Sequence, residues 1–146
     1  RQMCIRDRVY LNYAEALNEY YGESRQDEVL EYLNAIRERA GIPGYEDSYS
    51  QEEMREMIRH ERKIELCYEC QRFFDVRRWF IAHGPNGAFN HNEYGLDMSK
   101  GENATDKEFF SMTEAAIKRF DIKHYLMPIK ASECELNTEL VQAPFY

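Results

Sequence analysis

Apolar residues recur at the helical period over the first 81 positions of the chain. Val9, Tyr13, Leu17 and Tyr20 follow one another at intervals of three or four residues, which is the spacing of one buried helix face. This face is widened by Tyr10, Ala14 and Tyr21. Gly22 comes soon after, and glycine favours the left-handed backbone with which many helices end. This pattern predicts an amphipathic helix that stops at residue 22.

A second helix is predicted between residues 24 and 41. Ser24 is a candidate N-cap with Asp27 three residues later, and Gly41 followed by Pro43 marks the end. The expected inward positions are Leu30, Leu33, Ile36, Arg37 and Ala40. Two antiparallel helices joined by a short link that contains glycine form a helical hairpin.

Two further helices are predicted over residues 51–69 and 72–81. Ser50 and Glu53 have the spacing of a capping box, which marks the start of the first of them. The residues expected on the buried sides are Met54, Met57, Ile58, Ile64, Cys67 or Tyr68, Phe73, Phe74, Val76, Trp79 and Phe80. Successive helical hairpins are typical of repeat solenoids, but the Trp, Gly, Ala and Pro pattern of tetratricopeptide repeats is not met. The residues alone therefore indicate a helical repeat of undefined type.

The pattern changes after residue 81. Residues 82–107 are rich in glycine and asparagine, which predicts a long irregular loop. Residues 108–146 are predicted to dock on the body of the protein through a short extended segment and an apolar end. The expected fold is therefore mainly α, with helical hairpins over 9–81, an irregular loop over 82–107 and a docking segment over 108–146.

Composition and charge narrow the class of partner. The 146 residues suit one domain, and 27 acidic against 19 basic side chains give a net charge of −8, which disfavours nucleic acid. No apolar run approaches the roughly 20 residues that cross a bilayer. Residues 1–8 lack the apolar stretch of a signal peptide and place Arg6 and Arg8 where a helix start prefers acidic groups. We interpret 1–8 as a non-native leader joined to 9–146, a piece of a longer protein.

The candidate reactive groups favour structural roles. Cys67 and Cys70 form one CxxC pair at the predicted C-terminal end of a helix, whereas a structural zinc site needs four ligands and redox pairs sit at helix N-termini. Glu61 and Glu65 share a helix face, but charged neighbours surround them and no apolar pocket is indicated. The four histidines, which show no catalytic-triad spacing, are His60, His83, His91 and His124. The sequence predicts no catalytic residue, no metal and no cofactor.

Five blocks in order resemble the C-terminal half of the SusD/RagB family of lipoproteins. They are residues 10–16, 33–41, 61–66, 72–79 and the closing stretch that starts at Tyr125-Leu126-Met127-Pro128-Ile129. Their charged and aromatic side chains are expected to be structural, with guanidinium groups stacked on Phe74 and Trp79 in a packed corner. These expected structural residues are Arg62, Glu65, Arg72, Phe73, Phe74, Asp75, Arg77, Arg78 and Trp79.

The resemblance implies both a fold and a function. Such proteins are α-solenoids of tetratricopeptide-like hairpins with a more irregular ligand-binding portion. They are not enzymes: they sit on the outer-membrane surface of Bacteroidetes, held by a lipid anchor that is missing from this chain. They capture oligosaccharides or other nutrients and pass them to a SusC-like TonB-dependent transporter. That transporter and a glycan or other nutrient are the expected partners.

Two loops are candidates for contact with a ligand. Tyr45 and Tyr49 lie in one of them, and Phe89 and Tyr94 lie in the other. Aromatic rings offer sugars a flat partner, and the neighbouring Asn and Asp side chains supply hydrogen bonds. Two other functions stay open on the sequence. A generic helical-repeat module would bind peptides in a concave groove, and an enzyme would need carboxylates that converge in an apolar pocket.

Overall fold

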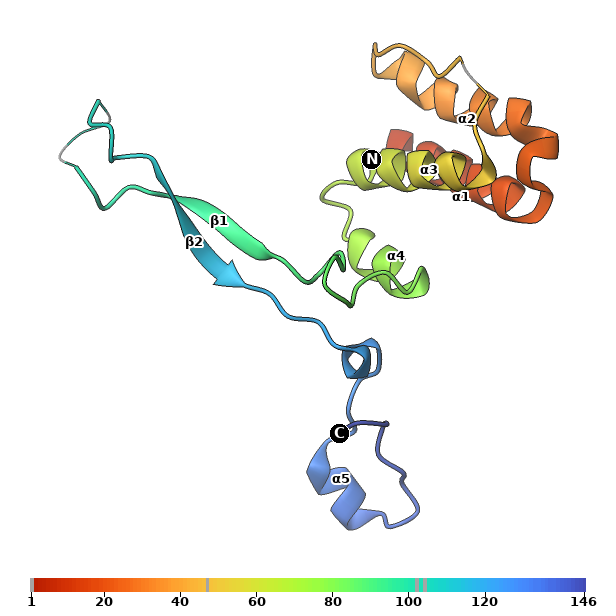
Figure 1. Ribbon diagram of the computed structural model, residues 1–146. Helices are drawn as coiled ribbons and strands as arrows, with labels where there is room; N and C mark the ends of the chain where they lie inside the picture. Colours follow the sequence, from red (N-terminus) through yellow and green to blue (C-terminus); the bar gives the residue numbers. More distant parts are fainter. Residues whose placement is uncertain (1, 47, 102, 104) are drawn as a thin grey trace. The chain divides into compact units, whose positions relative to one another are not determined.

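The chain folds into five α-helices, two short 3₁₀ turns and one two-stranded sheet among the residues described (Figure 1). The computed structural model describes residues 2–46, 48–101, 103 and 105–146. The elements are α1 Gln2–Tyr21, η1 Gly22–Arg25, α2 Gln26–Arg39, α3 Gln51–Glu65, α4 Arg72–Arg78, β1 Asn92–Asp97, β2 Ser111–Ile117, η2 Ile122–Tyr125 and α5 Ala131–Leu136. The mainly helical fold with helical hairpins is confirmed. The chain divides into a first unit, Arg1–Phe73, and a second unit, Phe74–Tyr146.

The core of the first unit lies where α1 packs against both α2 and α3. Its buried apolar residues are Leu11, Ala14, Leu17, Val29, Leu33, Ile36, Met54, Ile58 and Leu66. The stripe predicted for α1 is confirmed at Ala14 and Leu17, which are buried, and at Tyr10, which packs on the core. It was wrong at four positions that are exposed, Val9, Tyr13, Tyr20 and Tyr21. A tyrosine is apolar along its ring and polar at its hydroxyl, so the spacing of tyrosines does not distinguish a buried helix face from a partly solvent-exposed one.

The helix ends follow local capping rules in two of three cases. The Ser50 hydroxyl accepts a hydrogen bond from the backbone N–H of Glu53, and the backbone N–H of Ser50 donates one to the Glu53 carboxylate, so the predicted capping box is confirmed. Gly41, at a φ of 73°, ends α2 with the two backbone bonds of a Schellman motif. The cap predicted at Ser24 was wrong: its hydroxyl donates to the carbonyl of Tyr21 inside η1, and α2 begins after Arg25.

The helices α3 and α4 are shorter than predicted. α3 ends at Glu65, and the chain then turns with Tyr68 at a φ of 66°, which leaves Ile64, Cys67 and Tyr68 exposed instead of buried. α4 ends at Arg78 in a second Schellman arrangement, with Phe80 in the left-handed position where glycine is usual. Because neither stop uses glycine, the helical period alone could not locate them.

The loop predicted over 82–107 contains a strand. β1 pairs antiparallel with β2 in a register that opposes Tyr94 to Glu114 and Leu96 to Met112, with a bulge between Glu93 and Tyr94. The glycine and asparagine content of this segment masked a short alternation of side chains, which is the only local mark of a strand. The expected loop thus contains one strand of a β-hairpin, and the second strand lies in the predicted docking segment.

Candidate functional site

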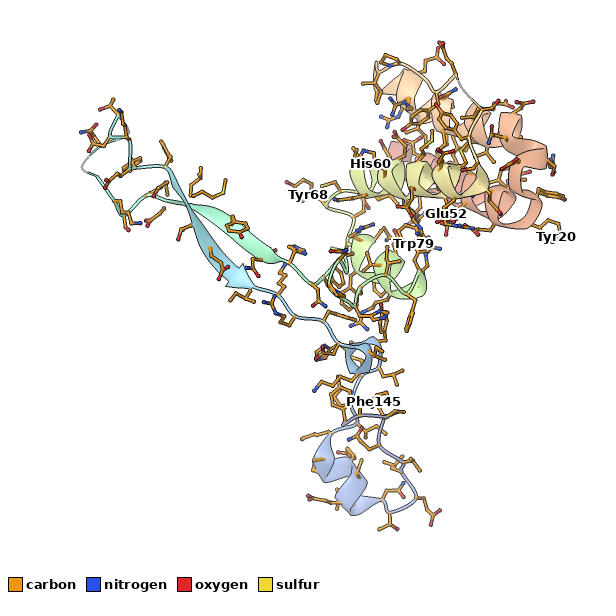
Figure 2. All side chains as sticks on the ribbon, viewed as in Figure 1. Tyr20, Glu52, His60, Tyr68, Trp79 and Phe145 are labelled. Atoms are coloured by element: carbon orange, nitrogen blue, oxygen red, sulfur yellow. The ribbon has the colours of Figure 1, made fainter. Side chains whose placement is uncertain are left out.

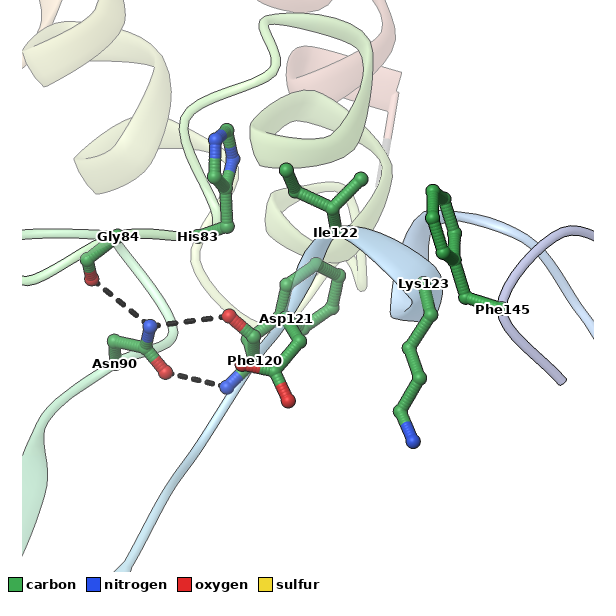
Figure 3. A pocket seen from close by; sticks show the side chains of 8 residues that line it. All are labelled: His83, Gly84, Asn90, Phe120, Asp121, Ile122, Lys123 and Phe145. Atoms are coloured by element: carbon green, nitrogen blue, oxygen red, sulfur yellow. Dashed lines mark hydrogen bonds between the residues drawn. The ribbon is translucent and has the colours of Figure 1, made fainter.

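The second unit contains an open pocket of about 480 Å³ (Figure 3). Its walls come from the segment after α4 and from the turn η2 with the two residues before it, and one side chain comes from the C-terminal segment. The lining residues are His83, Gly84, Asn90, Phe120, Asp121, Ile122, Lys123 and Phe145. Rings, an amide and charged groups therefore meet in one concave surface, as in many small-molecule sites.

The side chain of Asn90 fastens the two walls of this pocket together. Its Nδ2 donates to the carbonyl of Gly84 at 2.9 Å and to that of Phe120 at 3.0 Å, and its Oδ1 accepts the backbone N–H of Phe120 (Figure 3). One amide side chain thus bonds both the N–H and the carbonyl of a residue about 30 positions away, as a backbone does in paired strands. Asn90 therefore joins the two walls by three hydrogen bonds.

A cluster of aromatic rings supports the pocket from within the unit. The hydroxyl of Tyr125 accepts the backbone N–H of Ala82 at 2.8 Å and lies 2.9 Å from Nδ1 of His83, while its ring stacks on Phe80 at 4.5 Å. Phe120 meets the Tyr125 ring edge-on at 5.0 Å. These contacts tie η2 to the end of α4 and hold His83 against the pocket wall.

Charged and polar groups line the rim. The backbone N–H of Asp121 donates to Nδ1 of His124 at 2.8 Å, which places the proton of that imidazole on Nε2. The ammonium of Lys123 lies 5.5 Å from the centre of the Tyr146 ring. Asp121 is exposed and Lys123 is half-buried, so the lining of the pocket includes one carboxylate, which can accept hydrogen bonds, and one ammonium group, which can donate them.

Phe145 provides an exposed aromatic face at the same rim. It is 75% exposed and has a φ of 72°, a left-handed conformation that bulky residues avoid. The segment that carries it is anchored by Gln142, whose side chain exchanges two 2.8 Å hydrogen bonds with the backbone of Ile129. The C-terminal segment therefore presents a ring to the pocket instead of burying it.

The predicted ligand residues Phe89 and Tyr94 belong to this second unit but do not line the pocket. Phe89 is half-buried and packs on Phe120 with ring centres 5.7 Å apart, so it supports a pocket residue from behind. Tyr94 lies on β1 and is 62% exposed. The structure thus gives the two aromatic residues of this loop different environments.

The predicted ligand residues Tyr45 and Tyr49 come together in the first unit, in the segment between α2 and α3. Asn34 holds the backbone of Tyr45 by two bonds of 2.7 and 2.9 Å, and Gln26 holds that of Tyr49 in the same manner. Their rings meet edge-on at 6.2 Å and pack on the helical core. Asp47, within this loop, lies outside the described residues.

Tyr45 also takes part in a network of ionisable groups. Its hydroxyl donates to Glu61 at 2.8 Å, Arg37 pairs with the same carboxylate, and the Arg37 guanidinium stacks 4.1 Å from the Tyr45 ring centre. Burial, followed by the hydrogen bond to Glu61, raises the pKa of Tyr45 to about 12. These contacts engage both the ring and the hydroxyl of Tyr45 within the protein.

The residues Arg62 and Glu65 lie in a second network of the first unit. Arg62 is buried and donates to Oδ1 of Asn12 at 2.6 Å. Glu65 accepts from Arg39 at 2.7 Å, and Arg39 also lies 3.1 Å from the buried Asp7. Burial raises the pKa of the Glu65 carboxyl, with Arg39 opposing the rise and Asp7 adding to it.

α1 runs back through the predicted leader to Gln2, while Arg1 lies outside the described residues.

The residues predicted to form a packed corner occupy α4 and its end. Arg78 pairs with Asp75 at 3.0 Å, and its guanidinium lies 4.6 Å from the centre of the Trp79 ring. Arg77 donates to the carbonyl of Tyr125 at 3.0 Å. Arg72 is half-buried, while Phe73 and Phe74 are 41% and 61% exposed, so the inward packing expected of these two rings was wrong.

Sequence reasoning missed the pocket as a unit. The asparagine content of the loop was a signal, because Asn side chains bond backbone groups in irregular segments. It could not show that Asn90 pairs with Phe120. Among the described residues, no group of three or more His, Cys, Asp or Glu side chains is placed to hold a metal ion. Nor, in the same part of the chain, is any helix long and apolar enough to cross a membrane.

Helical hairpins and an irregular unit with an open aromatic pocket define a helical-repeat protein with a concave site. The chain belongs to the SusD family, whose model matches residues 8–146. It is 38% identical to SusD-like protein P2 of Formosa agariphila over 54% of this chain and 17% of that protein. SusD-like protein P25 of the same organism is 41% identical over 50% of this chain and 14% of that protein.

A solved structure extends the similarity to nearly the whole chain. The crystal structure of a SusD-like protein from Bacteroides fragilis superposes with a TM-score of 0.76 at 33% sequence identity, covering 96% of this chain and 25% of that one. The chain therefore spans about a quarter or less of the length of the relatives it matches.

Proposed function

We propose that this chain is part of a surface nutrient-binding subunit that captures oligosaccharides and delivers them to a SusC-like TonB-dependent transporter of the outer membrane. Membership of the SusD family supports this role. The observation that carries it further is the pocket of the second unit, where the exposed Phe145 ring lies beside Asp121 and Lys123.

These three side chains suit a sugar. A pyranose has one face of C–H groups that stacks on an aromatic ring, and its hydroxyls both donate and accept hydrogen bonds. Phe145 supplies the ring, the Asp121 carboxylate accepts, and the Lys123 ammonium donates. Asn90 and Phe120 fix the wall behind them.

Binding, and not catalysis, is the proposed activity. Glycoside hydrolysis uses two carboxyl groups roughly 5–10 Å apart on either side of the scissile bond. Asp121 is the one carboxylate among the described residues that line this pocket. The site thus offers contacts for holding a sugar and lacks the second carboxyl group of that reaction within its lining.

The two aromatic loops predicted from the sequence remain part of the proposal. Tyr94, with its exposed ring on β1, is proposed as a further ligand contact. Tyr45, Tyr49 and Phe89 are proposed to act indirectly, because each already packs within its own unit. Substituting Tyr94 by Ala tests the direct role and should weaken binding of a long oligosaccharide more than that of a disaccharide.

The test begins with a glycan-array screen of the full chain, followed by titration calorimetry with the oligosaccharides that bind. Phe145→Ala should weaken binding at least about tenfold, because it removes the stacking face. Phe110→Ala is the matched control, since Phe110 is a half-exposed phenylalanine of the same unit outside the pocket lining. Equal affinities of the two variants would remove the pocket from the proposal.

A further inference from the structure

The turn that follows α3 carries two thiols that the proposed function does not use. Cys67 and Cys70 are free and exposed. The backbone N–H of Cys67 donates to Ile64 at 3.2 Å, and that of Glu69 donates to Leu66 at 3.1 Å. These bonds hold a tight turn from which Tyr68, 98% exposed, projects (Figure 2).

The backbone of this turn is unusual for its residues. Tyr68 and Cys70 have φ values of 66° and 58°, in the left-handed region that side chains with a Cβ atom normally avoid. Left-handed residues other than glycine gather at functional sites, where the surrounding structure holds them in place. Here they set the direction of the chain between the two thiols and at the second of them.

Both cysteines line one pocket of the first unit, with a volume of about 440 Å³. Three basic side chains, Arg62, Lys63 and Arg72, share that lining. Their charges favour negatively charged groups in the pocket. A pair of thiolates, or a complex that carries their charge, is therefore better accommodated here than on an acidic surface.

We propose that Cys67 and Cys70 bind a single Cu(I) ion. Thiolate sulfur is a soft ligand that selects Cu(I) or zinc. Two thiolates complete the linear coordination common for Cu(I), whereas a structural zinc site takes four ligands. Binding releases two protons and leaves the metal oxidation state unchanged: Cu⁺ and two thiols give a bis-thiolate complex of charge −1 and two H⁺. The basic lining stabilises this anionic product.

The experiment is an anaerobic titration of the reduced full chain with Cu(I) in competition with a chromogenic Cu(I) chelator. Every protein in the series carries Cys4→Ser, so that the three thiols compared are those of residues 67, 70 and 134. The parent should take up one Cu(I) per chain. Cys67→Ser and Cys70→Ser should each bind at least about tenfold more weakly, because even the loss of a supporting group around a metal costs that much.

Cys134→Ser is the matched control, because Cys134 is a half-buried single thiol on α5. It should bind Cu(I) like the parent, and circular dichroism should show the same helical content in all variants. Retention of the parent affinity by Cys67→Ser, or loss of it in Cys134→Ser, would overturn the proposal. Lys63→Glu adds a second readout: it should weaken binding at low salt and have less effect at high salt.

Discussion

Each of the two units of this chain is stabilised internally in a different way. Among the side chains that the structure describes, nine apolar ones are buried in the core of the first unit, contributed by three helices and the turn that follows them. The buried cluster described in the second unit consists of Val76, Ala82 and Phe120 with half-buried rings around it. Packed helices are held by many interdigitating side chains, each of which contributes a similar share of the stability. An irregular unit instead depends on a few side chains, each of which makes several specific bonds.

Side-chain amides make this difference concrete. In the first unit, Asn34 and Gln26 bond the backbone of the loop between α2 and α3, which also packs on the helical core. In the second unit, Asn90 and Gln142 join segments that lie outside its helices and strands. The same chemistry is therefore auxiliary in one unit and forms the framework of the other.

The largest expected effect is the loss of a core side chain in the first unit. Leu33→Ala empties space at a fully buried position between helices and should cost about 2–5 kcal/mol of unfolding free energy. Far-UV circular dichroism during denaturation measures it, because the long helices lie in this unit.

Leu96→Ala is the control in the second unit, where Leu96 is 62% exposed on β1. It should change the unfolding free energy by less than about 0.5 kcal/mol. A cost for Leu96→Ala that matches that of Leu33→Ala would contradict the contrast in apolar burial between the two units.

A smaller effect, but one confined to the second unit, is expected at Gly87. A methyl group at this position would collide with the backbone carbonyl oxygens of Ala82 and His83. Those atoms belong to the loop whose bonds shape the pocket, so they cannot move freely. Gly87→Ala should cost about 1–3 kcal/mol, as overpacking does, and should weaken ligand binding in the pocket.

The matched control is Gly95→Ala on β1. A Cβ atom there makes an ordinary contact of 3.5 Å with Ala115, so the change should be nearly neutral. Trp79, the one tryptophan of the chain and a residue of the second unit, reports the transition by fluorescence. Equal midpoints for the two variants would show that the loop can relax around an added methyl group.

The contrast between the units also explains which parts of the structure could be predicted from the sequence. The hairpin of α1 and α2 and the start of α3 were predictable, because a periodic apolar face and a capping box are local signals. The orientation of α1 was not, since its tyrosines alternate between the core edge and solvent. A pattern of spacing locates a helix more securely than it selects the buried face.

The pocket was less predictable for a physical reason. Its geometry depends on pairings such as Asn90 with Phe120, which are about 30 residues apart and leave no periodic trace. Phe145 and Asp121 lie in segments whose local patterns predicted only docking and extension. The aromatic loop residue Phe89 does not line the pocket, and its ring packs on Phe120, which does.

The smallest expected effect concerns the charged network beside the core of the first unit. The pKa of Tyr45 is raised from its ordinary 10 to about 12, so folding favours the protonated phenol. The unfolded state therefore loses this proton first as pH rises. The stabilising contribution of Tyr45 is complete below pH 10 and is lost as pH rises from 10 through about 12.

Tyr45→Phe tests this contribution. At pH 7 it removes the hydrogen bond to Glu61 and should cost about 1 kcal/mol. Between pH 10 and 12 the unfolding free energy of the variant should fall less steeply than that of the parent. Tyr20→Phe serves as control, because Tyr20 is 81% exposed and should leave the slope unchanged. Parallel slopes for parent and Tyr45→Phe would mean that Tyr45 ionises equally in the folded and unfolded chains. The contribution of Tyr45 to the loop would then not depend on pH in this range, as is expected of the amide hydrogen bonds in the second unit.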